Sequence, residues 1–132
     1  MARRRRFSEE PFGPTIERLM GETGITYRGL ADKTKLSAGY LNHLVHGNRP
    51  VPSDKVVAQL ARALGVEPEH FREYRLRVIT RQLEAMPDLI DRLADALGVE
   101  PEHFREYRLR VITERLEQLP AMIDRLYKQL EK

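Results

Sequence analysis

Most of the chain follows one hydrophobic pattern, in which apolar residues return every three or four positions and polar residues fill the gaps. This spacing places the apolar residues on one side of a helix, whereas a half-buried strand requires strict alternation. The clearest stripe occurs three times, at 56–64, 89–97 and 122–130. No segment carries a convincing strand pattern. The sequence therefore predicts an all-α protein.

The repetition extends from the pattern to the letters themselves. The segment ALGVEPEHFREYRLRVIT stands at 63–80 and again, unchanged, at 96–113, which is an offset of 33 residues. Similarity continues through 81–93 and 114–126. These matches predict duplicated 33-residue helical hairpins, each with a short and a long helix. Natural duplication and deliberate design would both produce such a repeat.

Glycine and proline mark the expected helix boundaries. Gly65 and Gly98 follow the last apolar residue of a short helix, where a left-handed backbone is common. Pro68 and Pro101 are expected to open the long helices, with His70 and His103 in their first turns in a structural role. The two EPEHFREYR segments are expected to form an exposed face with ion pairs between residues four apart.

Residues 13–65 have the pattern of four short helices, and a tight turn at 34–37 joins the second to the third. Thr26 and Ser37 are the expected N-caps of the second and third helices. Leu41 and Leu44 should face the core, and Gly47 should end the third helix. Two short helices joined by such a turn form a helix-turn-helix unit.

The spacing of these residues resembles the Xre and lambda-repressor family of DNA-binding domains. The matching features are Leu30-Ala31, Ser37, Leu41 with Leu44, Gly47, Arg49-Pro50 and the segment LARALGVEPEHF at 60–71. The resemblance implies a five-helix repressor-type domain at 11–75, preceded by a basic arm at 1–10 and followed by a repeat extension at 76–132.

By this resemblance, helix 38–46 should lie in the DNA major groove with its first turn nearest the base edges. The candidates for base contact are Ala38, Gly39, Asn42 and His43. Asparagine can pair with adenine, and histidine can donate or accept a hydrogen bond. Ala38 and Gly39 offer only a methyl contact or a close backbone approach, so part of the readout is expected from DNA shape.

Phosphate contacts are expected from helix ends and from the basic arm. The candidates are Thr26, Tyr27, Arg28, Asn48, Arg49, Lys55 and the run Arg3, Arg4, Arg5 and Arg6. Contacts of this kind fix the register of a protein on DNA without reading its sequence. A solvated tail is the alternative for the arginine run, and a metal pair at His43 and His46 is less favoured than two polar surface residues.

The extension at 76–132 contains no copy of the recognition helix, so a second DNA-binding site is not expected. Repressors of this kind commonly bind as dimers, and the extension is the expected dimer or partner interface. The long helix at 101–119 has two apolar faces that a second subunit would cover. The candidates are Phe104, Tyr107, Leu109, Val111, Ile112 and Leu116. A continuation of the monomer's own helical stack is the alternative.

Composition narrows the classes of function. The 132 residues contain no cysteine, which removes disulfides, thiolate metal sites and cysteine nucleophiles and favours the cytoplasm. Residues 1–60 carry ten Lys or Arg against six Asp or Glu, so positive charge lies in the half expected to contact DNA. No catalytic pair, metal-ligand spacing or phosphate loop indicates an enzyme or a cofactor.

The sequence thus predicts a sequence-specific transcriptional regulator, most simply a dimeric repressor without a cofactor. The alternative is a protein-interaction module, either antitoxin-like or a helical-repeat scaffold.

Overall fold

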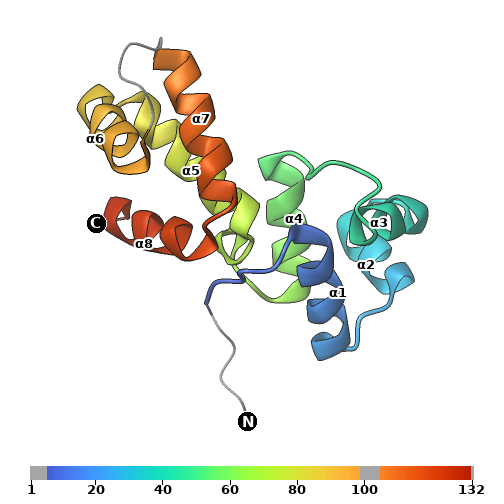
Figure 1. Ribbon diagram of the computed structural model, residues 1–132. Coiled ribbons are helices and arrows are strands. Elements are labelled where there is room, and N and C mark those ends of the chain that lie inside the picture. The colour runs from blue at the N-terminus through green and yellow to red at the C-terminus, as the bar shows by residue number, and fades with distance from the viewer. Residues whose placement is uncertain (1–5, 99–104, 132) are drawn as a thin grey trace. The chain divides into compact units, whose positions relative to one another are not determined.

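The protein is described by a computed structural model for residues 6–98 and 105–131, and within these ranges it contains helices and no strand (Figure 1). The chain divides into two units between Tyr74 and Arg75. The elements are α1 Phe12–Thr23, α2 Tyr27–Thr34, α3 Ala38–Val45, α4 Asp54–Leu64, a 3₁₀ turn η1 Pro68–His70, α5 Arg72–Glu84, α6 Pro87–Leu97, α7 Arg105–Glu117 and α8 Pro120–Leu130. The expected all-α class is confirmed.

The first unit is built around α1 to α4, the four short helices that the hydrophobic pattern predicted (Figure 1). Helix α2 packs against α3 and α4, and α1 packs against the same two helices. Their inward residues form one core with Phe71, which follows the 3₁₀ turn. Its fully buried members include Leu19, Leu30, Leu41, Leu60 and Leu64. These leucines recur at helical spacing, so the periodicity identified the core of this unit.

Gly13 allows α1 to approach the end of α3 closely. A Cβ atom at this position would lie 2.4 Å from the carbonyl oxygen of Val45 and 2.9 Å from that of Leu44. Both are backbone atoms that cannot move aside as a side chain would. Glycine is therefore required sterically where α1 crosses the last turn of α3.

The duplication in the sequence is matched by the bounds of the helices. Helices α4, α6 and α8 begin 33 residues apart, and so do α5 and α7. Gly65 and Gly98 end α4 and α6 with φ of 76° and 72°, which is the left-handed conformation expected after a helix. Helix bounds in the repeated segments thus follow the local sequence.

The beginning of the first long helix differs from the prediction. Pro68 opens the 3₁₀ turn, and α5 begins only at Arg72. The EPEHFREYR segment at 67–75 is also not the exposed charged face that was expected, because His70, Phe71 and Arg75 are at most 2% exposed. The physical reason is that this segment closes the core of the first unit and supplies a buried charge to the second. Pro101, His103 and Phe104 lie outside the described residues.

The second unit has a core of its own, to which α5, α6, α7 and α8 each contribute. Ile79, Ile90, Ile112 and Ile123 are fully buried, and Leu83 and Leu116 are 1% exposed. Helix α7 packs against both α6 and α8. An ion pair joins the first residues of this unit to its last helix, because the fully buried Arg75 guanidinium lies 2.7 Å from the carboxylate of Asp124.

No helix in the described part of the chain is long and apolar enough to cross a membrane.

Candidate nucleic-acid interface

The turn between α2 and α3 is held by one buried threonine and one residue with a left-handed backbone. The Thr34 hydroxyl donates to the carbonyl oxygen of Leu30 (2.8 Å) and accepts from the Leu36 amide (3.3 Å). Lys35 has a φ of 65°, and its amide donates to the carbonyl of Ala31 (2.8 Å). A left-handed residue reverses the chain without an additional loop. The turn therefore fixes α3 relative to α2 within three residues.

Both helices of this pair begin at the N-caps that the sequence predicted. The Thr26 hydroxyl accepts from the Gly29 amide at 3.1 Å, and the Ser37 hydroxyl accepts from the Tyr40 amide at 3.0 Å. Each bond satisfies one of the amides that a helix leaves without a partner in its first turn. The start of α3, where base contact is expected, is thus fixed by Ser37.

Helix α3 has one buried side and one exposed side. Leu41, Leu44 and Val45 are at most 6% exposed and pack into the core. The four residues predicted to contact bases, Ala38, Gly39, Asn42 and His43, are all exposed. They are spaced so that they share one face of the helix. The structure therefore brings these four residues together on the side of α3 that the domain leaves uncovered.

Within this face, side-chain length is uneven. A Cβ atom at Gly39 would meet no atom within 4 Å, so the backbone there is open to a molecule that approaches the helix. Asn42 and His43 carry the hydrogen-bonding groups one turn further along. The helix ends at Val45, one residue earlier than expected, and its C-cap is His46, whose ring Nδ1 donates to the carbonyl oxygen of Asn42 (2.8 Å).

The residues predicted to contact phosphates lie at helix ends within the same unit. Thr26, Tyr27 and Arg28 stand at the start of α2, Asn48 and Arg49 follow α3, and Lys55 is in the first turn of α4. All are exposed except Tyr27, which is partly buried and packs against the core. The left-handed Gly47 and the bond from the Asn48 amide to the carbonyl of His43 (2.9 Å) fold the chain back after α3.

One basic residue at this interface was missed by sequence reasoning. Lys35 is exposed and occupies the turn immediately before α3. Its position two residues before the Ser37 cap is the signal that could have identified it. A lysine there can contact a phosphate and also interacts favourably with the C-terminal end of α2.

The N-terminal basic segment is partly folded onto the domain. Arg3, Arg4 and Arg5 lie outside the described residues, and Arg6 is exposed with its guanidinium 4.7 Å from the centre of the Phe7 ring. Phe7 and Ser8 are buried. The structure thus places residues 7 and 8 within the folded domain, although the sequence predicted that the arm would extend to residue 10.

The predicted dimer interface is divided by the structure into buried and accessible residues. Ile112 and Leu116 are buried in the core of the second unit, so they are already occupied and are not exposed for a partner. Leu109 and Val111 remain partly exposed. Phe104 and the side chain of Tyr107 lie outside the described residues. The periodicity that suggested Ile112 and Leu116 cannot distinguish a face covered by the same chain from one covered by another.

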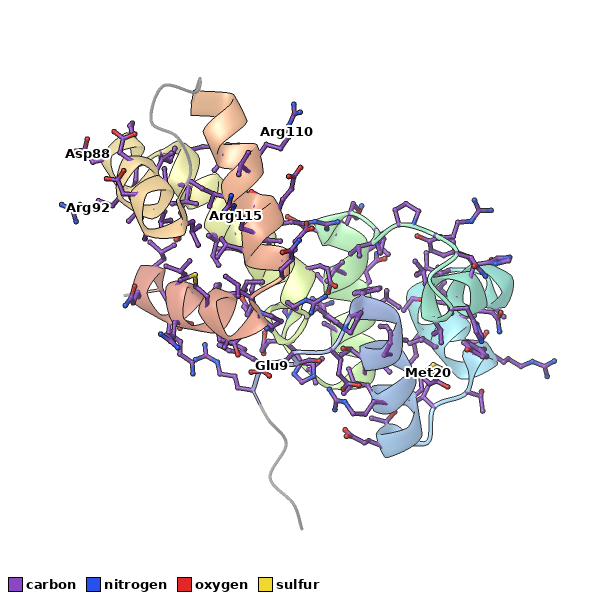
Figure 2. The ribbon with its side chains drawn as sticks, in the orientation of Figure 1. Glu9, Met20, Asp88, Arg92, Arg110 and Arg115 are labelled. Carbon is purple, nitrogen blue, oxygen red and sulfur yellow. The ribbon has the colours of Figure 1, made fainter. Side chains whose placement is uncertain are left out.

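Leu109 forms part of a groove of about 540 Å³ in the second unit. The groove is lined by Thr80 and Glu84 of α5, Ile90 of α6, and Leu109, Arg110, Thr113 and Glu114 of α7. Figure 2 shows Arg110 projecting outward from α7. The apolar side chains form part of the lining, and charges of both signs surround them.

Comparison with known proteins supports the assignment of the first unit. Residues 11–74 match the family model described as a helix-turn-helix domain, and this range includes α1 to α4, the 3₁₀ turn and the start of α5. No curated protein and no solved structure matches the chain significantly. The match and the geometry of α2, the turn and α3 agree. Residues 11–74 are therefore similar to a helix-turn-helix domain, and α2, the turn and α3 have the geometry of that motif.

Proposed function

We propose that the protein is a sequence-specific DNA-binding regulator of transcription of the repressor type, and that α3 is its recognition helix. The observation that carries the proposal is the exposed face of α3 in a helix-turn-helix domain. That face holds Ala38, Gly39, Asn42 and His43, while the opposite face is fixed in the core by Leu41 and Leu44. A helix held in this way can enter the major groove as a rigid body.

The residues of this face differ in the DNA contacts that they can make. The Asn42 amide can donate to and accept from an adenine edge, and His43 can donate or accept. Gly39 and Ala38 have no polar side chain, so they contribute closeness of approach and a methyl contact with thymine. Arg28, Lys35, Arg49 and Lys55 supply positive charge for phosphates, which fixes register.

The decisive experiment is a selection of bound duplexes from a random DNA pool, with the full-length protein at near-physiological salt. A two-part inverted motif with half-sites about one helical turn apart would support a dimeric reader. A motif without a second half-site would support a monomeric reader. Recovery of DNA without any motif would contradict sequence-specific recognition, because binding would then depend on charge alone.

The second unit is the proposed site of self-association or of a protein partner. This part of the proposal is supported by the groove beside Leu109, a residue that remains partly exposed there. Sedimentation of the full-length protein over a concentration series tests it. Two copies at micromolar concentration are expected, and Leu109→Glu should shift the protein to a single copy. A monomer at all concentrations would contradict the dimer.

The antitoxin-like or scaffold alternative depends on the same groove. It is favoured if the selected DNA pool shows no motif and the α3 substitutions have no effect on function. The proposal gives the protein a binding role without catalysis, and the absence of cysteine in the sequence is in keeping with a cytoplasmic location.

A further inference from the structure

His70 lies in the 3₁₀ turn of the first unit and is 2% exposed. Its ring joins two parts of the domain that are distant in sequence. The ring Nδ1 lies 3.0 Å from the carbonyl oxygen of Arg6, and the ring Nε2 lies 3.0 Å from Nη2 of Arg18 on α1. The backbone of the same residue accepts from the Ser8 amide at 2.8 Å. Residues 6 to 8 are therefore fastened to the domain at His70.

These two ring contacts determine the protonation state of the imidazole. A carbonyl oxygen can only accept a hydrogen bond, so Nδ1 must carry the proton that it donates to Arg6. An arginine nitrogen can only donate, so Nε2 must present a lone pair to Arg18. Both conditions are met by one form alone, the neutral imidazole with its proton on Nδ1.

The arginine that donates to His70 is itself held in the charged form. Arg18 pairs with Glu10 at 2.8 Å and with Glu22 at 3.0 Å. Burial lowers the pKa of Arg18, but the hydrogen bonds and negative charges of Glu10 and Glu22 raise it, and the net pKa lies above the ordinary value for arginine. Arg18 thus remains a cation wherever the protein is folded.

The segment that His70 holds is anchored by several further contacts. The Ser8 and Thr15 hydroxyls lie 2.7 Å apart, and the Arg72 guanidinium donates to the carbonyl oxygen of Glu9 at 3.1 Å. Figure 2 shows Glu9 in this segment just before α1. The charged group on α1 that contacts the ring is Arg18, which is paired with Glu10 and Glu22. Arg72 and Glu73 follow His70 in the chain, lie on α5 and pair with each other at 3.5 Å.

We propose that His70 is a pH-sensitive latch, which fastens residues 6–8 to the helix-turn-helix domain when its imidazole is neutral and releases them when it is protonated. A second proton on the imidazole would occupy Nε2 and point at the Arg18 guanidinium, which is itself a donor. The hydrogen bond to Arg18 would then be lost, and the imidazolium would face the guanidinium cation. Acidification therefore favours the released segment, because release allows the imidazole to take up a proton. The basic run at 3–6 leads directly into this latch.

The test uses the full-length protein labelled with ¹⁵N, and none of its readouts depends on DNA binding. At pH 7.5 the imidazole nitrogen shifts of His70 should show the tautomer protonated on Nδ1. The protection of the Ser8 amide against hydrogen exchange should be high at pH 7.5. It should fall about tenfold for each pH unit in the acid range, because one proton is taken up on release.

Two substitutions assign the effect to His70. His70→Gln keeps a neutral donor and acceptor, so Ser8 protection should become equal at pH 7.5 and pH 5. His43→Gln is the matched control, because His43 is exposed on α3 and its replacement should leave the pH dependence unchanged. Arg18→Gln tests the latch if His70→Gln does not fold, and it should weaken the pH dependence by removing the opposing cation.

The latch is overturned by any of three results. These are a His70 ring protonated on Nε2 at pH 7.5, Ser8 protection that does not change with pH, and the same pH dependence in His70→Gln as in the original protein. None of them bears on the proposed DNA-binding function, which the selection experiment tests separately.

Discussion

The segments at 63–80 and 96–113 have the same sequence but lie in different surroundings. Leu64 at the end of α4 is fully buried, whereas the equivalent Leu97 at the end of α6 is partly exposed. Leu76 is 8% exposed, whereas its equivalent Leu109 lines a groove. The helices nevertheless begin and end at equivalent residues. Local sequence therefore fixes the helix, and the neighbouring elements fix how much of it is buried.

The difference arises from the number of elements around each copy. Among the described residues, helix α4 packs against α1, α2 and the 3₁₀ turn, whereas α6 packs mainly against α7. Some equivalent positions are buried in both copies, since Ile79 and Ile112 are each fully buried. The repeated stripe thus contributes to a core in both units, and in the first unit α1 and α2 add further cover over α4.

The largest effect on stability is expected when the same substitution is made at Leu64 and at Leu97, which are equivalent positions of the repeat. Leu64→Ala should lower the free energy of unfolding of its unit by about 3 to 4 kcal/mol, because a fully enclosed leucine leaves a cavity. Leu97→Ala should cost only about 1 to 2 kcal/mol, because its site is partly solvated. Urea unfolding followed by circular dichroism and by residue-resolved exchange measures both. Equal losses would show that the two surroundings are energetically equivalent.

The buried ion pair gives the second comparison. Asp124→Ala should destabilise the second unit by roughly 3 kcal/mol, because it removes the carboxylate that neutralises the buried Arg75. Asp91 occupies the equivalent repeat position in α6 and is exposed, so solvent screens its charge and Asp91→Ala should cost less, at most about 1 kcal/mol. Residue-resolved hydrogen exchange in α5 and α8 reports the difference. A small effect of Asp124→Ala would mean that Arg75 is stabilised by its other neighbours.

Helix α3 provides a third comparison, because it has no counterpart in the repeated segments. Asn42→Ala and His43→Ala should each cost about 1 to 3 kcal/mol on the preferred DNA sequence and much less on other sequences. Arg49→Ala is the control, since loss of a phosphate contact weakens binding to all sequences alike. Titration of matched and scrambled duplexes measures each loss. An equal loss on both duplexes would assign Asn42 and His43 to the DNA backbone.

The smallest expected effect comes from two open glycines in helices. A Cβ atom at Gly39 or Gly21 would meet nothing within 4 Å, so alanine at either position should stabilise the domain by about 0.5 to 1 kcal/mol. Only Gly39 lies on the exposed face of α3, so only Gly39→Ala should also change DNA affinity. Thermal unfolding and DNA titration separate the two effects. Unchanged affinity in Gly39→Ala would exclude close backbone approach at this residue.

Much of the first unit could be predicted from the sequence. Spacing of leucines identified the buried sides of α1 to α4, and the side-chain oxygens of Thr26 and Ser37 marked the starts of α2 and α3. The choice of Asn42 and His43 on α3 came instead from the resemblance to repressor-type domains. These features depend on residues near one another in the chain, where side-chain periodicity and capping chemistry act directly on the backbone.

Other features were decided by the tertiary structure alone. The sequence EPEHFREYR appears exposed and charged, yet His70 and Arg75 within it are buried because α1 supplies Arg18 and α8 supplies Asp124. Ile112 and Leu116 appeared available to a partner, yet the second unit covers them itself. In each case the deciding contact joins residues far apart in the chain. Burial and partner choice depend on which surfaces meet, whereas helix formation depends on local spacing.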